Sequence, residues 1–290
     1  MKWKGRRSSS NVTDKRGQTV ARTAGAGALI HLVGRTFGMK GLMWAAAIIG
    51  LLWITGIVDP TTFLGGGVQP RSEPYQPTPE EQERYEFVTV VLADTEDIWT
   101  EEFRVRGASY RAPQLVIYTD ATQTACGMGQ AAMGPFYCPG DETIYVDLGF
   151  YDELEQTFRA PGDFAQAYVI AHEVGHHVQN LLGTSDQVHR MRGRPDYNQW
   201  SVRLELQADF YAGVWARQNQ QYLDRGDIEE AMTAANAIGD DAIQGRMRGT
   251  VVPHTFTHGT SEQRQRWFMN GLQTGRMEDG NTFEMAYEQL

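Results

Sequence analysis

The feature that most limits how this chain can fold is a run of eighteen residues without a charged side chain, Gly41 to Val58. A helix of that length is close to the minimum needed to cross about 30 Å of hydrocarbon. A buried core helix would normally carry a polar stripe. A cleaved signal peptide usually has a shorter apolar run, of about 7–15 residues, and a small-residue cleavage site. The sequence therefore predicts an uncleaved transmembrane signal anchor over residues 41–58.

Charge is distributed unevenly on the two sides of this run. Residues 1–40 contain nine Lys or Arg and a single acid, Asp14, whereas the rest of the chain contains 17 Arg and 35 acids. Basic residues beside a membrane span favour the cytoplasmic side. We therefore expect a basic cytoplasmic arm over residues 1–40 and an extracytoplasmic domain after the anchor, periplasmic if the cell has an outer membrane.

The composition of the main domain excludes several kinds of chemistry. No lysine follows Lys40, so the domain has no lysine nucleophile, Schiff-base lysine or P-loop lysine. Its acidity also argues against nucleic acid as a partner, because phosphate neutralisation needs clustered positive charge.

The remaining sequence predicts a linker followed by one α+β domain. Residues 59–80 are rich in Gly and Pro and are typical of a flexible tether. A helix is expected from about Thr78 to Phe103, because Thr-Pro-Glu-Glu is a helix-start pattern. Two β-type runs follow, at 114–119 and 143–147, and the sequence beyond Tyr151 is mainly helical. We expect a mainly helical domain with a small β-sheet over residues 81–290.

The only two cysteines, Cys126 and Cys138, lie between the two predicted strands. Outside the cytoplasm, such a pair is typical of a disulfide that closes a small loop. The alternative is two unpaired thiols. A cysteine metal site is less well supported, because two sulfurs alone make an incomplete ligand set.

The segment Gly162 to Gly183 carries the pattern H-E-x-x-H on a predicted helix, which Asp163 is expected to cap. His172 and His176 are four residues apart, so their rings share one helix face at the spacing that two ligands of one zinc ion need. Glu173 is placed to take a proton from a zinc-activated water without binding the metal. The alternative is a pair of structural histidines on a buried helix.

A catalytic zinc ion needs a third protein ligand, and Glu205 is the best candidate. Glu205 and Asp209 are four residues apart on a predicted apolar helix, so they share one face. We expect Glu205 to complete the metal site and Asp209 to hold the far nitrogen of a ligand histidine. A solvated acidic face is the usual meaning of this spacing and remains the alternative.

A third segment, around His258 and Arg264, supports two interpretations equally. Either side chain could stabilise the oxyanion that forms during amide hydrolysis. Alternatively, the two side chains only satisfy backbone groups in a loop that ends at a helix cap, at Thr260 or Ser261.

Together these segments resemble the bacterial neutral zinc metallopeptidase family of single-pass membrane proteins. The resemblance covers nearly the whole chain, through the opening MKWKGRRSSSNVTDKRG, the apolar anchor, CGMGQAAMGPFYCPGDETIYVDLGFYDEL, AHEVGHHVQ, ELQADFYAGVWA and FTHGTSEQR. It implies a zincin-type domain. A more distant similarity to membrane gluzincins implies that His258 and Arg264 stabilise the oxyanion, although those proteins usually have Pro where this chain has Gly259.

The resulting hypothesis is an anchored metallopeptidase that uses Zn²⁺ to cleave a peptide or protein substrate. Glu173 is its expected general base, and the predicted strand 143–147 is an expected edge for substrate pairing. The rival hypothesis is a non-catalytic membrane adaptor with a structural zinc. A structural zinc site would have a fourth protein ligand, such as His177 or His254.

Overall fold

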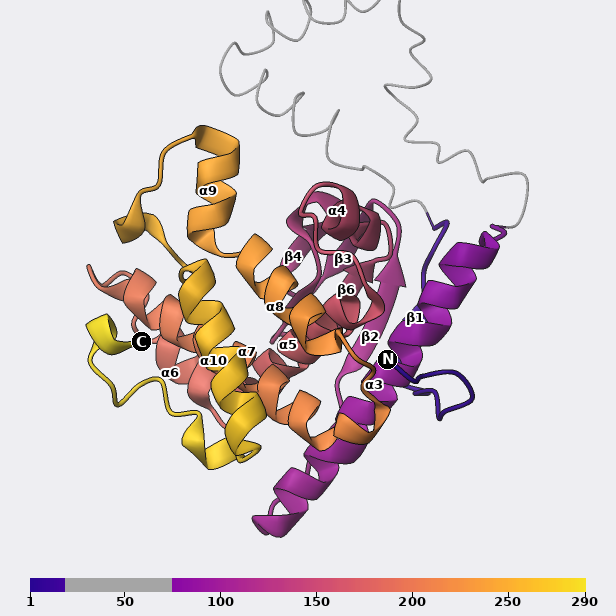
Figure 1. Cartoon of the computed structure of the whole chain (residues 1–290), viewed down its shortest axis with the longest axis horizontal. Coiled ribbons are helices and arrows are strands. Elements are labelled where there is room, and N and C mark those ends of the chain that lie inside the picture. Colours follow the sequence, from indigo (N-terminus) through magenta and orange to yellow (C-terminus); the bar gives the residue numbers. More distant parts are fainter. Residues whose placement is uncertain (19–74) are drawn as a thin grey trace, which may run out of the picture. The chain divides into compact units, whose positions relative to one another are not determined.

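The computed structural model describes residues 1–18 and 75–290, of which Met1–Arg16 and Pro77–Leu290 form one compact unit (Figure 1). The predicted anchor at 41–58 and most of the predicted linker lie outside the described residues. Within these two ranges, no helix is both long and apolar enough to cross a bilayer.

The first helix of the main domain is α3 (Pro79–Val105), which begins where the sequence predicts. Thr78 accepts a hydrogen bond from the backbone N–H of Glu81, and the Glu81 side chain accepts one from the backbone N–H of Thr78. This reciprocal cap satisfies two N–H groups that a helix start would otherwise leave unpaired. The buried part of α3 includes Trp99 and Phe103, which join the main hydrophobic core.

A four-stranded sheet lies beside α3 and has the order β1-β2-β6-β5. Strands β1, β2 and β6 are parallel, and β5 is antiparallel to β6. A separate antiparallel hairpin is formed by β3 and β4. The sequence predicts β2 and β6 within one residue, but it misses the four shorter strands. The bounds are β1 Val12–Asp14, β2 Gln114–Tyr118, β3 Ala121–Thr124, β4 Gly127–Gln130, β5 Phe136–Cys138 and β6 Thr143–Asp147.

The N-terminal segment is part of this fold, which differs from the predicted separate arm over residues 1–40. Strand β1 pairs with β2, with Val12 opposite Leu115. Arg6 forms an ion pair with Asp94 of α3 at 2.5 Å. The basic residues near the N-terminus therefore meet acids of the same domain rather than a membrane surface. Met1–Arg16 therefore belongs to the same folded unit as Pro77–Leu290.

Beyond Tyr151 the described chain is mainly helical, as the sequence predicts. Figure 1 shows α5, α7, α8 and α10 gathered beside the sheet, while α9 projects away from them. The first four pack against one another through the main core, whereas α9 has no buried residue. The bounds are α4 Phe150–Gln156, α5 Asp163–Leu181, α6 Thr184–His189, α7 Tyr197–Gln218, α8 Asp227–Ala237, α9 Asp240–Arg248 and α10 Ser261–Thr274.

Glycines bring α7 very close to α10. A Cβ atom added to Gly213 of α7 would lie 2.1 Å from the carbonyl oxygen of Phe268, and one added to Gly271 of α10 would lie 2.0 Å from that of Phe210. No side chain fits at such distances, so glycine is required at both positions. This contact fixes α7 relative to α10, and these two helices carry three of the predicted site residues.

The predicted disulfide between Cys126 and Cys138 is confirmed, with an S–S distance of 2.08 Å. Cys126 lies in the turn between β3 and β4, and Cys138 ends β5. The bond therefore ties the hairpin to the end strand of the larger sheet.

Candidate metal centre

Helix α5 carries the H-E-x-x-H residues on a buried helix. The rings of His172 and His176 lie one turn apart, with centroids 4.8 Å apart and planes nearly perpendicular. The helix ends before Gly183, which has the left-handed conformation expected after a helix C-terminus. The predicted cap by Asp163 is wrong, because Asp163 is the first helical residue and Glu230 of α8 accepts the Phe164 N–H instead.

Glu205 of α7 reaches both histidines. Its Oε2 lies 3.2 Å from Nε2 of His172, and its Oε1 lies 3.5 Å from Nε2 of His176. The candidate ligand atoms of these three residues all lie within 4.8 Å of one another. The structure therefore brings together the three side chains that the sequence nominates as ligands, from two helices.

The charge state of Glu205 suits a metal ligand. Burial alone would raise the pKa of Glu205, but the nearby His176 and His258 hold it well below its usual value. Glu205 therefore stays an anion in a buried setting, which is the form that binds a cation.

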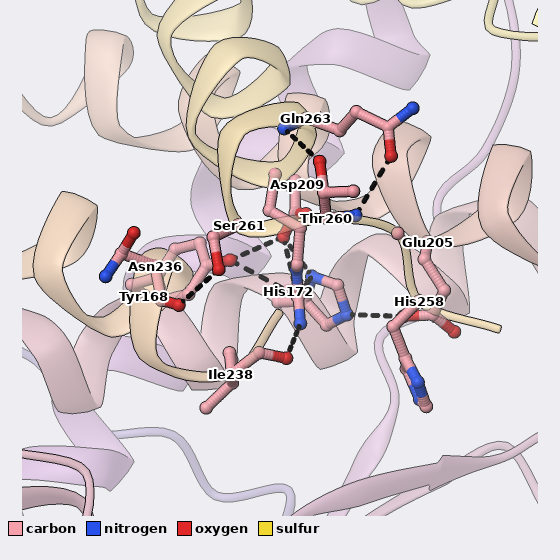
Figure 2. Close-up of polar contacts among 12 residues, drawn as sticks. Tyr168, His172, Glu205, Asp209, Asn236, Ile238, His258, Thr260, Ser261 and Gln263 are labelled. Carbon is pink, nitrogen blue, oxygen red and sulfur yellow. Dashed lines mark hydrogen bonds and ion pairs between the residues drawn. The ribbon is translucent and has the colours of Figure 1, made fainter. Parts of the chain in front are cut away.

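Asp209 lies one turn after Glu205 and binds the opposite side of the His172 ring (Figure 2). Its Oδ1 is 2.7 Å from Nδ1 of His172, and Tyr168 donates its hydroxyl to the same oxygen at 2.5 Å. Burial alone would raise the pKa of Asp209, but Arg264 and His172 hold it at about 2. As a carboxylate can only accept, Nδ1 carries a proton, and the lone pair of Nε2 of His172 is left for binding a metal ion.

Arg264 occupies a different place from the one expected for an oxyanion donor. Its guanidinium donates to both oxygens of Asp209, at 2.8 and 2.9 Å, and also to the Ile238 carbonyl at 3.2 Å. The side chain is 3% exposed and lies on the Nδ1 side of His172. Arg264 therefore holds Asp209 behind the metal centre, and the oxyanion role predicted for it does not fit this geometry.

Gln179 supports the second histidine, a role that the sequence did not reveal. Its Oε1 lies 2.9 Å from Nδ1 of His176, and its Nε2 donates to the Leu204 carbonyl at 2.6 Å. Gln179 is fully buried. Its amide therefore sets the tautomer of His176 and ties α5 to the residue before Glu205. Its position three residues after His176 is the signal that could have suggested it.

Glu173 is 8% exposed and lies on α5 beside the first histidine. Burial raises the pKa of Glu173, and the neighbouring histidines oppose that change. A raised pKa makes a carboxylate a stronger base once it is ionised.

His177 is not directed to the metal centre. Its Nε2 donates to the Arg111 carbonyl at 2.5 Å, and Tyr137 of β5 lies 3.0 Å from its Nδ1. Burial lowers the pKa of His177, which fits a neutral ring in this pair of bonds. His177 therefore links α5 to β5.

His258 lies in the loop before α10, and Figure 2 shows it beside Glu205. The Glu205 charge is the largest influence on the pKa of His258 and raises it. The His258 side chain is half exposed, so it is accessible from solvent. The predicted helix cap is also present, because Thr260 forms a reciprocal cap with Gln263 at the start of α10.

Known proteins are similar to this chain in sequence. The sequence profile of the family described as "Putative neutral zinc metallopeptidase" matches residues 1–283. YpfJ of Escherichia coli (strain K12) is 44% identical over 293 residues, which cover 98% of this chain and 99% of that protein. Mb2605 of Mycobacterium bovis and Rv2575 of Mycobacterium tuberculosis are each 42% identical over 190 residues, covering 61% of this chain and 64% of each relative. No solved structure matches. The chain belongs to the neutral zinc metallopeptidase family.

Proposed function

We propose that this protein hydrolyses peptide bonds in a peptide or protein substrate, with one zinc ion held by His172, His176 and Glu205. The observation that carries the proposal is the convergence of two imidazole nitrogens and one carboxylate, in which each imidazole is also held through its other nitrogen. Three protein ligands are the number found in catalytic zinc sites, which keep one position open.

The donor set fits zinc in kind and in spacing. Imidazole and carboxylate are both common zinc ligands, at about 2.0–2.2 Å, and in a tetrahedral site this radius separates the ligand atoms by about 3.4 Å. Oε2 of Glu205 lies 3.2 Å from Nε2 of His172, and Oε1 of Glu205 lies 3.5 Å from Nε2 of His176. When bound, zinc acidifies a water molecule and polarises a carbonyl group.

The protein residues divide the remaining work. Glu173 is the proposed general base, which takes a proton from the attacking water and returns it to the leaving amine. His258 is the proposed donor to the oxyanion, because it lies beside Glu205 on the accessible side. Asp209, Arg264 and Gln179 hold the two histidines and touch no substrate.

The proposed edge for substrate pairing is β5 rather than the predicted strand 143–147. That strand, β6, lies inside the sheet between β2 and β5, so both of its edges are paired. Strand β5 ends the sheet and is tied to α5 through Tyr137 and His177. An extended peptide added to an edge strand gains main-chain hydrogen bonds.

The number of candidate metal ligands supports an enzyme rather than the adaptor alternative. Among the described residues, the group around His172 contains only three candidate ligands, and both nitrogens of His177 are engaged elsewhere. His254 is exposed and is not a member of the group. A structural zinc site would be closed by four protein ligands.

We also propose that the domain works outside the cytoplasm. The Cys126–Cys138 disulfide supports this location, because such bonds persist in oxidising compartments. Membrane attachment through residues 41–58 stays a prediction from the sequence.

The test is a comparison of the zinc-loaded wild type with Glu173→Gln on a library of denatured proteins. We expect the wild type to generate new peptide termini, and the variant to bind zinc equally while losing at least about a hundredfold in rate. Equal cleavage by both would remove Glu173 as the base. A zinc-loaded wild type that cleaves nothing would favour the adaptor.

A further inference from the structure

The loop that carries His258 is held by a carboxylate outside the metal centre. Asp240, the first residue of α9, accepts hydrogen bonds at Oδ2 from three successive backbone N–H groups. They belong to Thr257, His258 and Gly259, at 2.7, 2.6 and 3.1 Å. The backbone N–H of Asp240 also donates to the Gly259 carbonyl at 2.9 Å. These bonds join the two ends of the segment formed by residues 241–256.

The same carboxylate reaches the His258 ring. Oδ1 of Asp240 lies 3.3 Å from Nδ1 of His258, which also lies 3.0 Å from the Thr257 hydroxyl. The Asp240 side chain is 13% exposed, whereas that of His258 is 50% exposed. A carboxylate can only accept a hydrogen bond, so Nδ1 carries a proton and Nε2 is the nitrogen left for a further partner.

Gly259 explains how the loop comes to lie beside Glu205. Its φ is +93°, and a Cβ atom there would lie 3.3 Å from side-chain carbons of Val202 and Leu206. Proline, which the gluzincin pattern has at this position, is fixed near −65° and could not adopt this φ. The loop therefore packs on α7 next to Glu205, in a geometry of its own.

We propose that Asp240 is the positioning residue for His258: it fixes both the backbone and the ring, so that His258, as an imidazolium ion with a proton on each ring nitrogen, can donate from Nε2 to the oxyanion. This inference rests on the proposed peptidase function. It gives His258 the kind of support that Asp209 gives His172, because in each case a carboxylate accepts a hydrogen bond from Nδ1. Positioning of this kind matters because an oxyanion donor is effective only when its geometry is set before the reaction.

A double-mutant cycle tests whether Asp240 acts through His258. In zinc-loaded full-length protein, we expect Asp240→Asn to lower kcat by at least about tenfold and to change KM little. The same substitution in a His258→Ala background should have no further effect. Multiplicative losses in the double variant, or an unchanged kcat in Asp240→Asn alone, would overturn the proposal.

Asp241→Asn is the matched control. Asp241 neighbours Asp240 but binds Ser261, at 2.7 and 2.8 Å, rather than His258. This variant should lose stability while keeping kcat.

A measurement that does not depend on catalytic activity separates this inference from the proposed function. Nitrogen-15 NMR of labelled histidine in the wild-type protein, with His258→Ala used to assign the signal, should show a protonated Nδ1 in neutral His258. Asp240→Asn should move that proton to Nε2, and Asp241→Asn should not. A wild-type His258 that in its neutral form carries the proton on Nε2 rather than on Nδ1 would overturn the proposal even if the enzyme is active or if Asp240→Asn does not fold. Absence of cleavage by the wild type, with Nδ1 protonated, would instead count against the peptidase function alone.

Discussion

Oδ1 of Asp209 lies 2.7 Å from Nδ1 of His172, on the side of the ring opposite to Glu205. This contact decides which nitrogen of His172 can bind a metal. The carboxylate is itself held by Arg264 and Tyr168, so the ring orientation is set by a buried hydrogen-bond network.

Asp209→Asn should weaken zinc binding by about 10–100-fold, because a ligand histidine loses the carboxylate that orients it. The variant should also unfold more easily, by about 3–5 kcal/mol, since Arg264 remains buried without its anion. Zinc affinity can be measured by competition with a chelator. Tyr168→Phe, which removes one hydroxyl from Asp209, is the milder control. An unchanged affinity in Asp209→Asn would show that His172 is oriented without it.

Gln179→Leu should lower zinc affinity by about tenfold, because His176 loses the acceptor at Nδ1. Gln207→Leu is the matched control. Gln207 bonds Gln179 and the Gly280 carbonyl but touches neither histidine. The control should lose stability and keep most of its affinity. Equal losses of affinity in the two variants would mean that Gln179 acts only through packing.

Glu96→Ala should loosen the N-terminal segment. The Glu96 carboxylate accepts hydrogen bonds from Arg7, Ser9 and Asn11, so its loss leaves three donors without their acceptor and should cost about 1–3 kcal/mol. Hydrogen exchange should accelerate at the Ser9 and Leu115 amides, which pair the segment with the domain. Asp97→Ala removes a 70% exposed partner of Arg7 and should change stability by less than about 1 kcal/mol. Unchanged exchange in Glu96→Ala would contradict the docked segment.

Ionisation of Asp94 should lower the free energy of unfolding as the pH rises from about 4 to 7. Burial raises the pKa of Asp94 to about 6, although Arg6 opposes this, whereas an unfolded aspartate has a pKa near 3.9. The folded state therefore binds the proton more tightly, and the stability present below pH 4 is lost as pH passes through 6. The loss is at most about 3 kcal/mol. Chemical unfolding at several pH values should show a weaker decline in Asp94→Asn; identical pH slopes would contradict this.

Short-range spacing patterns made much of the metal centre predictable. His172 and His176 share a helix face by spacing alone, and so do Glu205 and Asp209. The helix cap at Thr260 was also predictable, because threonine is a common residue at helix N-termini. These features depend on residues that are close in sequence, so helix geometry alone relates them to one another.

Features that depend on distant contacts were not predictable. Strands β1 and β5 have three residues each, too few for an alternating pattern. The basic residues of the N-terminal segment have the composition of a membrane-facing arm, and only the fold brings Asp94 and Glu96 to them. Arg264 was misassigned for the same reason, because its buried position behind His172 follows from how α10 packs on α7.

The most direct test of the three-ligand centre is the zinc-to-protein ratio of the purified full chain, measured by mass spectrometry of the metal. Wild type and Glu205→Gln would be prepared identically and dialysed against the same weak chelator. The structure predicts about one zinc per chain in the wild type and little in the variant, because two histidines alone hold zinc weakly. Equal zinc in both proteins, or none in the wild type, would contradict the centre formed by His172, His176 and Glu205.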